Sequence, residues 1–180
     1  MRCISKKVKG VFMNVNQNRS HAPRTRQEHQ TNSYNKNNTQ RNDTLICALG
    51  GLGEVGKNMY CFEHGNEILF VDSGVRFPEE DLLGVDYVIP DYNHLVKNNR
   101  KRKVLVITHG HEDHIGGIPF LLKTVDIEAI YAPAFAVALI TKKLEERKML
   151  RGVKLIEISD RSSLKMHHFT CGFCNTTHSI

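Results

Sequence analysis

The stretch VLVITHGHEDHIGGIPFLL, residues 104–122, combines the features that decide how this chain folds. Its first part, VLVIT, is a short β-branched run, which predicts a buried strand. Its last part, which continues to Lys123 as IGGIPFLLK, predicts a helix with an irregular start, because two glycines and Pro119 interrupt its first turns. Between the two, residues 109–114 place three histidines and two acids within six positions. The chain therefore gathers metal-ligand side chains where a strand gives way to a helix.

His109 and His111 are two positions apart, so their imidazoles point the same way in an extended chain. Asp113 and His114 follow where the chain turns into the helix, and they can face the same cavity from another side. Neutral imidazole and carboxylate together suit zinc or a similar first-row divalent ion. Four candidate ligands exceed the three of a typical catalytic zinc, which favours two ions about 3.5–4 Å apart. The pattern predicts metal-assisted hydrolysis; the alternative, a solvated charged loop, rarely follows a buried strand.

The flanking sequence predicts a layered α/β domain. MYCFEH and EILFVD pair most naturally as an antiparallel hairpin around the turn Gly65-Asn66. A helix is predicted over Ala134–Leu150, with Pro133 at its start and Gly152 beyond its end. VKLIEI returns to a strand, and HHFTCGFCNTTHSI predicts one or two more. Strands in hairpins, followed by alternating strands and helices, thus define the fold class.

A glycine pattern near the start of the structured sequence suggests a different fold. Gly51, Gly53 and Gly56 have the G-x-G-x-x-G spacing of dinucleotide-binding units, and Asp72 ends an apolar run about 20 residues later. Such a unit needs a crossover helix after the glycines. Only the ten residues 57–66 are available for it, and they carry the predicted hairpin. No nucleotide cofactor is therefore expected.

Composition limits the class of protein. The chain has 180 residues, 40% of them hydrophobic, no tryptophan and a formal charge of +6, which allows one ordinary domain. No uninterrupted apolar stretch approaches the roughly 20 residues that span a bilayer, so no membrane association is expected. Five irregularly spaced cysteines suit a reducing cytosol better than a disulfide framework, and a cytoplasmic location is predicted.

The positive charge belongs to residues 1–43. They hold nine lysines and arginines against two acids, whereas residues 44–180 hold sixteen against seventeen. This segment is rich in asparagine and glutamine and offers few apolar groups to bury, which predicts a disordered tail. A solvated extension and a basic arm that grips phosphate backbones both remain open. Residues 44–180 are predicted to form the folded domain.

The HGHEDH segment resembles the metallo-β-lactamase superfamily, whose signature is H-x-H-x-D-H at this strand-to-helix junction. Asp72, in FVDSG, looks like the superfamily's first motif, an acid that braces the metal loop. His178, in NTTHSI, looks like the third motif, a further ligand of the first metal. The resemblance implies an αββα sandwich.

Within that superfamily, the segments LGGLGEVGKNM, FPEEDLLGVDYVIPDYNHL, ITHGHEDHIGGIPFLL and TTHSI are similar to ribonuclease J, a family of the β-CASP group. The similarity covers Leu45–Ile180 and implies hydrolysis of RNA phosphodiesters in RNA processing and decay. Cleavage is expected from a 5′ end and also internally. It also implies zinc as cofactor, RNA as partner, and dimers or tetramers of the whole protein.

Carried over residue by residue, the resemblance implies that His109, His111 and His178 hold one zinc and that Asp113 and His114 hold the other. Asp113 would also steer the proton of the attacking hydroxide. A later aspartate and histidine of the family pattern, and the β-CASP insertion, have no counterpart before Ile180.

We therefore expect an N-terminal part of a metallo-β-lactamase domain, truncated before the β-CASP domain, that is unstable and inactive alone. Two alternatives stay open: a hydrolase of a small ester or thioester, and a non-catalytic remnant that binds RNA through its basic arm.

Overall fold

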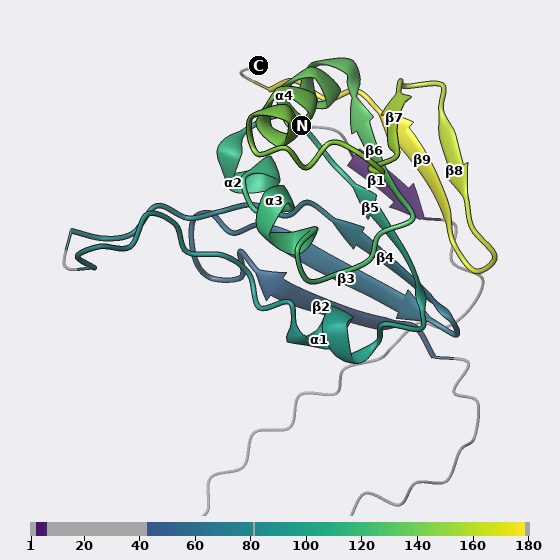
Figure 1. The fold of residues 1–180 in the computed structure, drawn as a ribbon. Helices are drawn as coiled ribbons and strands as arrows, with labels where there is room; N and C mark the ends of the chain where they lie inside the picture. Colours follow the sequence, from purple (N-terminus) through teal and green to yellow (C-terminus); the bar gives the residue numbers. More distant parts are fainter. Residues whose placement is uncertain (1–2, 7–42, 81, 179–180) are drawn as a thin grey trace, which may run out of the picture.

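The computed structural model describes residues 3–6, 43–80 and 82–178, with only the backbone for residues 3–6. The strands are β1 (Cys3–Lys6), β2 (Leu45–Gly50), β3 (Met59–His64), β4 (Glu67–Val71), β5 (Arg102–Val106), β6 (Ala129–Pro133), β7 (Leu155–Ile158), β8 (Ser163–Lys165) and β9 (Thr170–Cys174). The helices are α1 (Asn93–Lys97), α2 (Glu112–Ile115), α3 (Ile118–Leu121) and α4 (Ala134–Glu146). Figure 1 shows a large sheet with helices α2, α3 and α4 on one side and β1, β8 and β9 on the other.

The large sheet has the strand order β2-β3-β4-β5-β6-β7. Strands β3 and β4 pair antiparallel, with His64 opposite Glu67, which confirms the predicted hairpin around Gly65. From β4 to β7 the strands run parallel. Because β2 and β3 are antiparallel neighbours, glycines 51–56 lie in the connection between them and not before a crossover helix. The topology therefore agrees with the rejection of a dinucleotide-binding unit.

Side chains that alternate along the strands build two cores, one on each face of the large sheet. In β4, Ile68 and Phe70 pack with the helices, whereas Leu69 packs with the small sheet. Strand β5 lies between both cores, and its Val104, Leu105 and Val106 are fully buried. Burial on both faces explains why this strand reads as a continuous apolar run. The layers are helix, large sheet and small sheet, a partial αββα sandwich as expected.

The small sheet has the order β1-β9-β8. Strands β8 and β9 form an antiparallel hairpin, as the C-terminal sequence suggested. Strand β1 pairs with the other edge of β9, Cys3 opposite Cys174. Four residues of the segment expected to be disordered thus form a strand, because the edge of β9 offers backbone partners. The rest of that expectation concerns residues 7–42, outside the described residues, and the boundary at residue 43 stays a prediction.

The helix expected after the histidine segment is broken in two at Gly116-Gly117. The loop after β4 packs against this break. A Cβ on Gly117 would come within 2.8 Å of the carbonyl oxygens of Ser73 and Gly74, and a Cβ on Gly74 would lie only 1.5 Å from that of Asp113. Glycine is therefore required on both sides of the contact, because any side chain would push the loop away from α2.

Helix α4 begins at Ala134 as predicted but ends at Glu146, short of the expected Leu150. Lys148 adopts the left-handed conformation, with φ of 56°. The amide of Lys148 donates to the carbonyl of Glu145, and the amide of Met149 donates to that of Leu144. This pair of bonds is a Schellman motif, which ends a helix even when its left-handed residue is not glycine. The helix therefore stops before Gly152 is reached.

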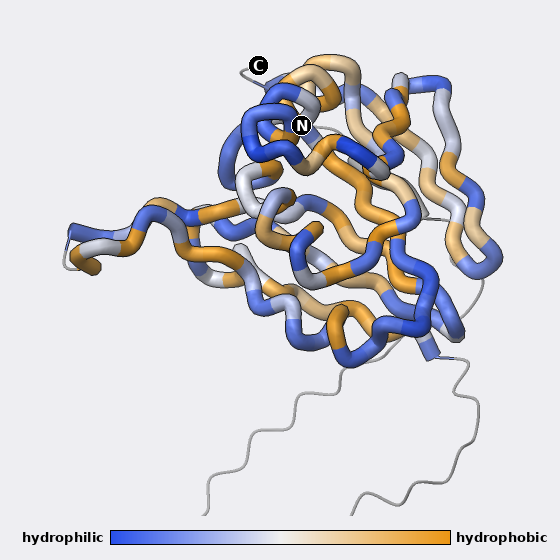
Figure 2. The backbone as a smooth tube through the Cα atoms, in the orientation of Figure 1, coloured by the Kyte–Doolittle hydropathy of each residue, from blue (hydrophilic) through white to orange (hydrophobic). Residues whose placement is uncertain are grey.

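A long connection, residues 76–90, projects from the body of the molecule between β4 and α1 (Figure 1). Its base is closed by an antiparallel bridge between Arg76 and Val88. Figure 2 shows apolar residues along it. Those with exposed side chains are Phe77, Leu82, Leu83, Val85, Tyr87 and Ile89. Across the described ranges, no helix has the length and apolar character needed to cross a membrane.

Candidate metal centre

The histidine loop lies where the parallel strands β4 and β5 end. The amide of Asp72, directly after β4, donates to the carbonyl of Val106 at the end of β5, with an N–O distance of 2.8 Å. The amide of Ser73 donates at 2.9 Å to the carbonyl of His114 on α2. Because residues at the carboxyl ends of parallel strands meet at one edge of the sheet, Asp72 lies beside the loop formed by residues 107–111.

Three imidazole nitrogens converge in this loop. Nε2 of His109 lies 3.0 Å from Nδ1 of His111 and 3.0 Å from Nε2 of His178. His178 reaches the loop from the segment after β9, 69 residues further along the chain. His109 is buried, His111 is partly buried and His178 is exposed, so the cluster opens to solvent on the His178 side.

A buried carboxylate lies behind the histidines. Asp72, only 3% exposed, accepts the amide and the hydroxyl of Thr108, at 2.8 Å and 2.9 Å. Nδ1 of His114 lies 2.8 Å from the same carboxylate. An ionised carboxylate only accepts hydrogen bonds, so the neutral His114 ring carries its proton on Nδ1 and keeps the Nε2 lone pair for the site.

Thr108 fixes the tautomer of His109 in the same way. Its hydroxyl gives its single proton to Asp72, so Oγ1 accepts the Nδ1–H of His109 at 2.9 Å. The neutral His109 ring therefore presents the lone pair of Nε2 to His111 and His178. One buried carboxylate, directly and through one hydroxyl, thus fixes the tautomers of two histidines. This is the second layer of contacts that metal-binding imidazoles require.

Asp113 and His114 form the other half of the arrangement. Nδ2 of Asn58 donates to Oδ2 of Asp113 at 3.0 Å and lies 3.3 Å from Nε2 of His114. Nε2 of His114 is 3.4 Å from the same Oδ2, and the ring centroids of His114 and His109 are 4.0 Å apart. The structure therefore places these two residues beside the three-histidine cluster, as their sequence positions suggested.

Electrostatics keep the cluster available to a cation. Burial, together with the neighbouring His114, His178 and His111, lowers the pKa of His109 to about 4. His109 is consequently neutral near pH 7. Burial acts in the same direction on His114, but its hydrogen bond to Asp72 and the charge of that carboxylate outweigh it and raise the His114 pKa. A bound ion would compete with the proton on His114.

The donor set fits zinc. The ligand nitrogens of His109, His111 and His178 lie within 4.8 Å of one another. Tetrahedral zinc, with Zn–N bonds of about 2.0–2.1 Å, needs nitrogens about 3.4 Å apart, so a small adjustment suffices. Sequence reasoning missed Asn58 and Thr108. Thr108 directly precedes the first histidine, but its role depends on Asp72, 36 residues away.

Comparison with known proteins gives the family. Residues 52–170, more than half of the chain, match the model of the metallo-β-lactamase superfamily. The chain belongs to the metallo-β-lactamase superfamily. The matched range contains the whole Asp72-to-His114 arrangement. The fold class and the superfamily inferred from the HGHEDH segment are thereby confirmed.

Curated relatives support the narrower resemblance. The chain is 54% identical over 139 residues to ribonuclease J 1 of Streptococcus pyogenes serotype M3, covering 77% of this chain and 25% of that protein. It is 50% identical over 137 residues to ribonuclease J of Mycoplasma genitalium, covering 76% and 24%. The chain thus spans about a quarter of the length of these relatives. A solved diphosphatase of the PhnP family shares 12% identity at a TM-score of 0.41, covering 62% of this chain and 40% of that one, too distant a likeness to carry an argument.

A pocket of about 280 Å³ opens beside the cluster. Its walls come from the histidine loop, the first turn of α4 and the segment before His178. The lining residues are Thr108, His109, Gly110, Pro133, Ala134, Phe135, Ala136, Asn175, Thr176 and His178. Pro133, the N-cap of α4, makes no side-chain capping bond, and the first turn of the helix contains no acid. The positive end of the α4 dipole therefore faces the pocket without a competing negative side chain.

Proposed function

We propose that this chain carries the metal centre of a ribonuclease that hydrolyses RNA phosphodiester bonds. One observation carries the proposal: three imidazole nitrogens converge beside an Asp113–His114 pair, in a chain 54% identical to a ribonuclease J. Two-metal hydrolysis is the chemistry that this donor set suits best. Because the chain spans only about a quarter of the length of these relatives, their full activity, RNA substrates and self-association are proposals for this chain.

In this proposal, His109, His111 and His178 hold one zinc ion and Asp113 with His114 holds the second. When bound, the ions would supply a water molecule acidic enough to act as nucleophile near neutral pH. Asp113, whose carboxylate is partly exposed beside the cluster, would take the proton of that water. Asn58 holds one oxygen of Asp113 in place by donating to Oδ2.

The pocket gives the phosphate a place beside these ligands. The first amides of α4 have no partner within the helix, and the residues that carry them, including Ala134 and Phe135, line the pocket. A scissile phosphodiester lying against this turn has its negative charge stabilised by the helix dipole, while its phosphorus faces His109 and His178. Phe135 is 59% exposed and offers a flat face for a nucleobase. RNA fits such a pocket better than a neutral ester does.

The decisive experiment exchanges matching segments. Residues 43–178 replace the corresponding quarter of Streptococcus pyogenes ribonuclease J 1, and the chimera is assayed with zinc on 5′-monophosphorylated RNA. We expect cleavage that is lost in His109→Ala and Asp113→Ala chimeras and retained in an Asp86→Ala chimera, since Asp86 is exposed on the projecting connection. The 180-residue chain alone, expected to be inactive, is assayed in parallel.

The competing functions predict different results. A folded, zinc-loaded chimera that turns over a small ester or thioester but leaves RNA intact would favour the small-molecule hydrolase. Salt-sensitive RNA binding by the 180-residue chain, lost on deleting residues 1–43 and without cleavage in the chimera, would favour the non-catalytic RNA-binding protein.

A further inference from the structure

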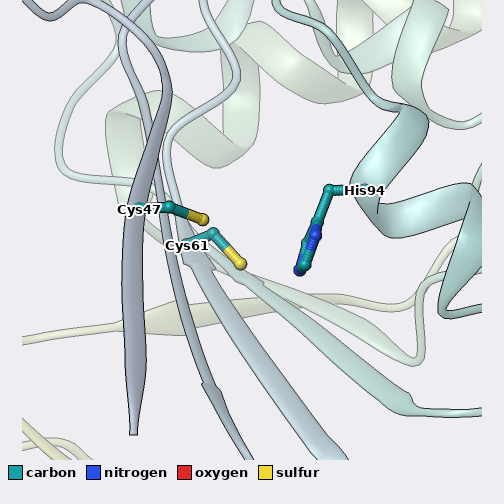
Figure 3. Close-up of side chains that lie close together, drawn as sticks. All are labelled: Cys47, Cys61 and His94. Carbon is teal, nitrogen blue, oxygen red and sulfur yellow. The ribbon is translucent and has the colours of Figure 1, made fainter. Parts of the chain in front are cut away.

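A second group of metal-ligating side chains lies apart from the histidine loop. Cys47 on β2 and Cys61 on β3 are directly opposite each other in the antiparallel register. His94 projects toward them from α1, as Figure 3 shows. One ligand atom from each of the three residues lies within 4.8 Å of the other two. This group shares no residue with the proposed hydrolytic centre.

The histidine of this group is oriented by a carboxylate. Nε2 of His94 lies 2.7 Å from Oε2 of Glu63, and Lys101 donates to Oε1 of the same carboxylate. With Nε2 engaged, Nδ1 is the ring nitrogen left for the two sulfurs. A carboxylate bound to the outer nitrogen of an imidazole is the usual support of a metal-binding histidine, because it fixes the ring and makes it a better donor.

A metal-binding role explains the surroundings of the two thiols better than a role in apolar packing does. Cys61 is completely buried and Cys47 partly buried, on the face of the sheet covered by α1. Burial raises the pKa of the Cys61 thiol, and the adjacent Cys47 raises it further, so the Cys61 thiol is protonated in the absence of a cation. Apolar packing of two cysteines requires no imidazole with a bonded carboxylate beside them.

We propose that Cys47, Cys61 and His94 form a binding site for a thiophilic divalent ion, zinc in the first place. Two thiolates and one imidazole are a preferred donor set for zinc, and water completes the tetrahedron. Two Zn–S bonds and one Zn–N bond form, two S–H bonds break, and the two protons pass to solvent. Zinc ligands stand about 3.5–3.8 Å apart, so the three side chains must close slightly.

At this position a bound ion would stabilise the packing of α1 against the large sheet. Helix α1 has five residues and no side-chain cap at its start, so it depends on tertiary contacts for stability. A metal bond from His94 to β2 and β3 would fasten α1 to the sheet. Strand β5, which leads into the histidine loop, follows α1 after four residues.

Cobalt titration of the intact 180-residue chain, reduced with a phosphine, tests the proposal. Thiolate–cobalt coordination gives a near-ultraviolet charge-transfer band that histidine-only coordination lacks, so the band distinguishes this site from the histidine cluster. We expect the band to saturate at one equivalent in the His109→Ala variant, whose histidine cluster is incomplete, and to disappear when zinc is added. Cys47→Ala and Cys61→Ser should abolish it, and Glu63→Gln should weaken cobalt binding by about 10–100-fold.

Two controls separate this site from others. Cys174→Ser should leave the band unchanged, and so should His109→Ala, which affects only the proposed hydrolytic centre. Cys47 is only partly buried, so the Cys47→Ala variant should fold, and its circular dichroism is compared with that of the parent. A parent without the band, a band that survives Cys47→Ala, or a band lost in Cys174→Ser would each overturn the proposal.

Discussion

Glu67 joins the two sheets, and its replacement by glutamine gives a sharp test of how the small sheet is held. Its carboxylate, 5% exposed at the start of β4, accepts the amide of His167 at 3.0 Å and that of His168 at 2.7 Å. Arg102 donates to it at 3.0 Å. The two amides belong to the turn between β8 and β9, and β9 leads directly to His178. Glu67 therefore holds the strand that delivers the third histidine.

The expected cost of Glu67→Gln follows from these bonds. A hydrogen bond to a charged group contributes about 1.5–3 kcal/mol, and a buried donor left without a partner costs about 1–3 kcal/mol. Glutamine removes the charge and turns one acceptor into a donor facing an amide N–H. We expect a loss of about 2–4 kcal/mol in the free energy of unfolding. In urea, with a slope of about 2 kcal/mol per molar, the midpoint should fall by about 1–2 M.

The pH dependence of this difference checks the mechanism. Burial raises the pKa of Glu67, but the amides of His168 and His167 and the Arg102 guanidinium outweigh it, so the pKa is lowered. A lowered carboxyl pKa stabilises the fold above the ordinary value of about 4.3, and this contribution is lost as the pH falls through the folded-state pKa. The difference in the free energy of unfolding between parent and variant should be constant from pH 6 to 8 and become smaller in acid.

Urea unfolding of the 180-residue chain, followed by circular dichroism in the presence of a chelator, measures both quantities. Glu157→Gln, at an exposed position on β7, is the matched control and should change stability by less than about 0.5 kcal/mol. The reasoning would be refuted if Glu67→Gln lowered the free energy of unfolding no more than the control does. It would also be refuted if the difference between parent and Glu67→Gln stayed the same at low pH.

Three further substitutions, two of them with a control variant, test other parts of the structure. Asp72→Asn should lower the zinc affinity of the histidine cluster about 10–100-fold in a calorimetric titration, whereas Asp86→Asn should not, because only Asp72 fixes the histidine tautomers. Gly74→Ala should cost about 3 kcal/mol or more in urea unfolding, because its Cβ would overlap the Asp113 carbonyl. Gly53→Ala, with φ of 73° and open space, should cost only about 1–2 kcal/mol. Lys148→Gly should raise the thermal midpoint, with a gain of about 1 kcal/mol, since it relieves a left-handed lysine.

Features encoded in a few neighbouring residues could be predicted. The Gly65-Asn66 hairpin, the buried strand β5 and the grouping of His109, His111, Asp113 and His114 follow from local spacing. His178 and Asp72 were assigned only through the family resemblance, because nothing in their own neighbourhoods requires a ligand or a brace. In the structure His178 lies 3.0 Å from His109, and Asp72 lies 2.8 Å from His114, because distant strands end at the same place.

Features that depend on distant contacts could not be predicted. The last turn expected for α4 is missing because Met149, Leu150 and Val153 pack against the helical core, which draws the chain out of the helix before Gly152. The position of His94 beside the two cysteines could not be predicted, because it depends on the register of β2 with β3 and on where α1 is placed. Registers and helix positions of this kind are set by the whole core.

The backbone at Asp72 shows how the site is fixed before any ion binds. Asp72 is left-handed, with φ of 64°, a conformation that costs a non-glycine residue about 1–2 kcal/mol. Three donors converge on its carboxylate, and its amide is bound to Val106, so the contacts together outweigh this strain. The next two residues, Ser73 and Gly74, pack against α2. The conformation that strains the backbone is thus the one that aims the carboxylate at His114 and, through Thr108, at His109.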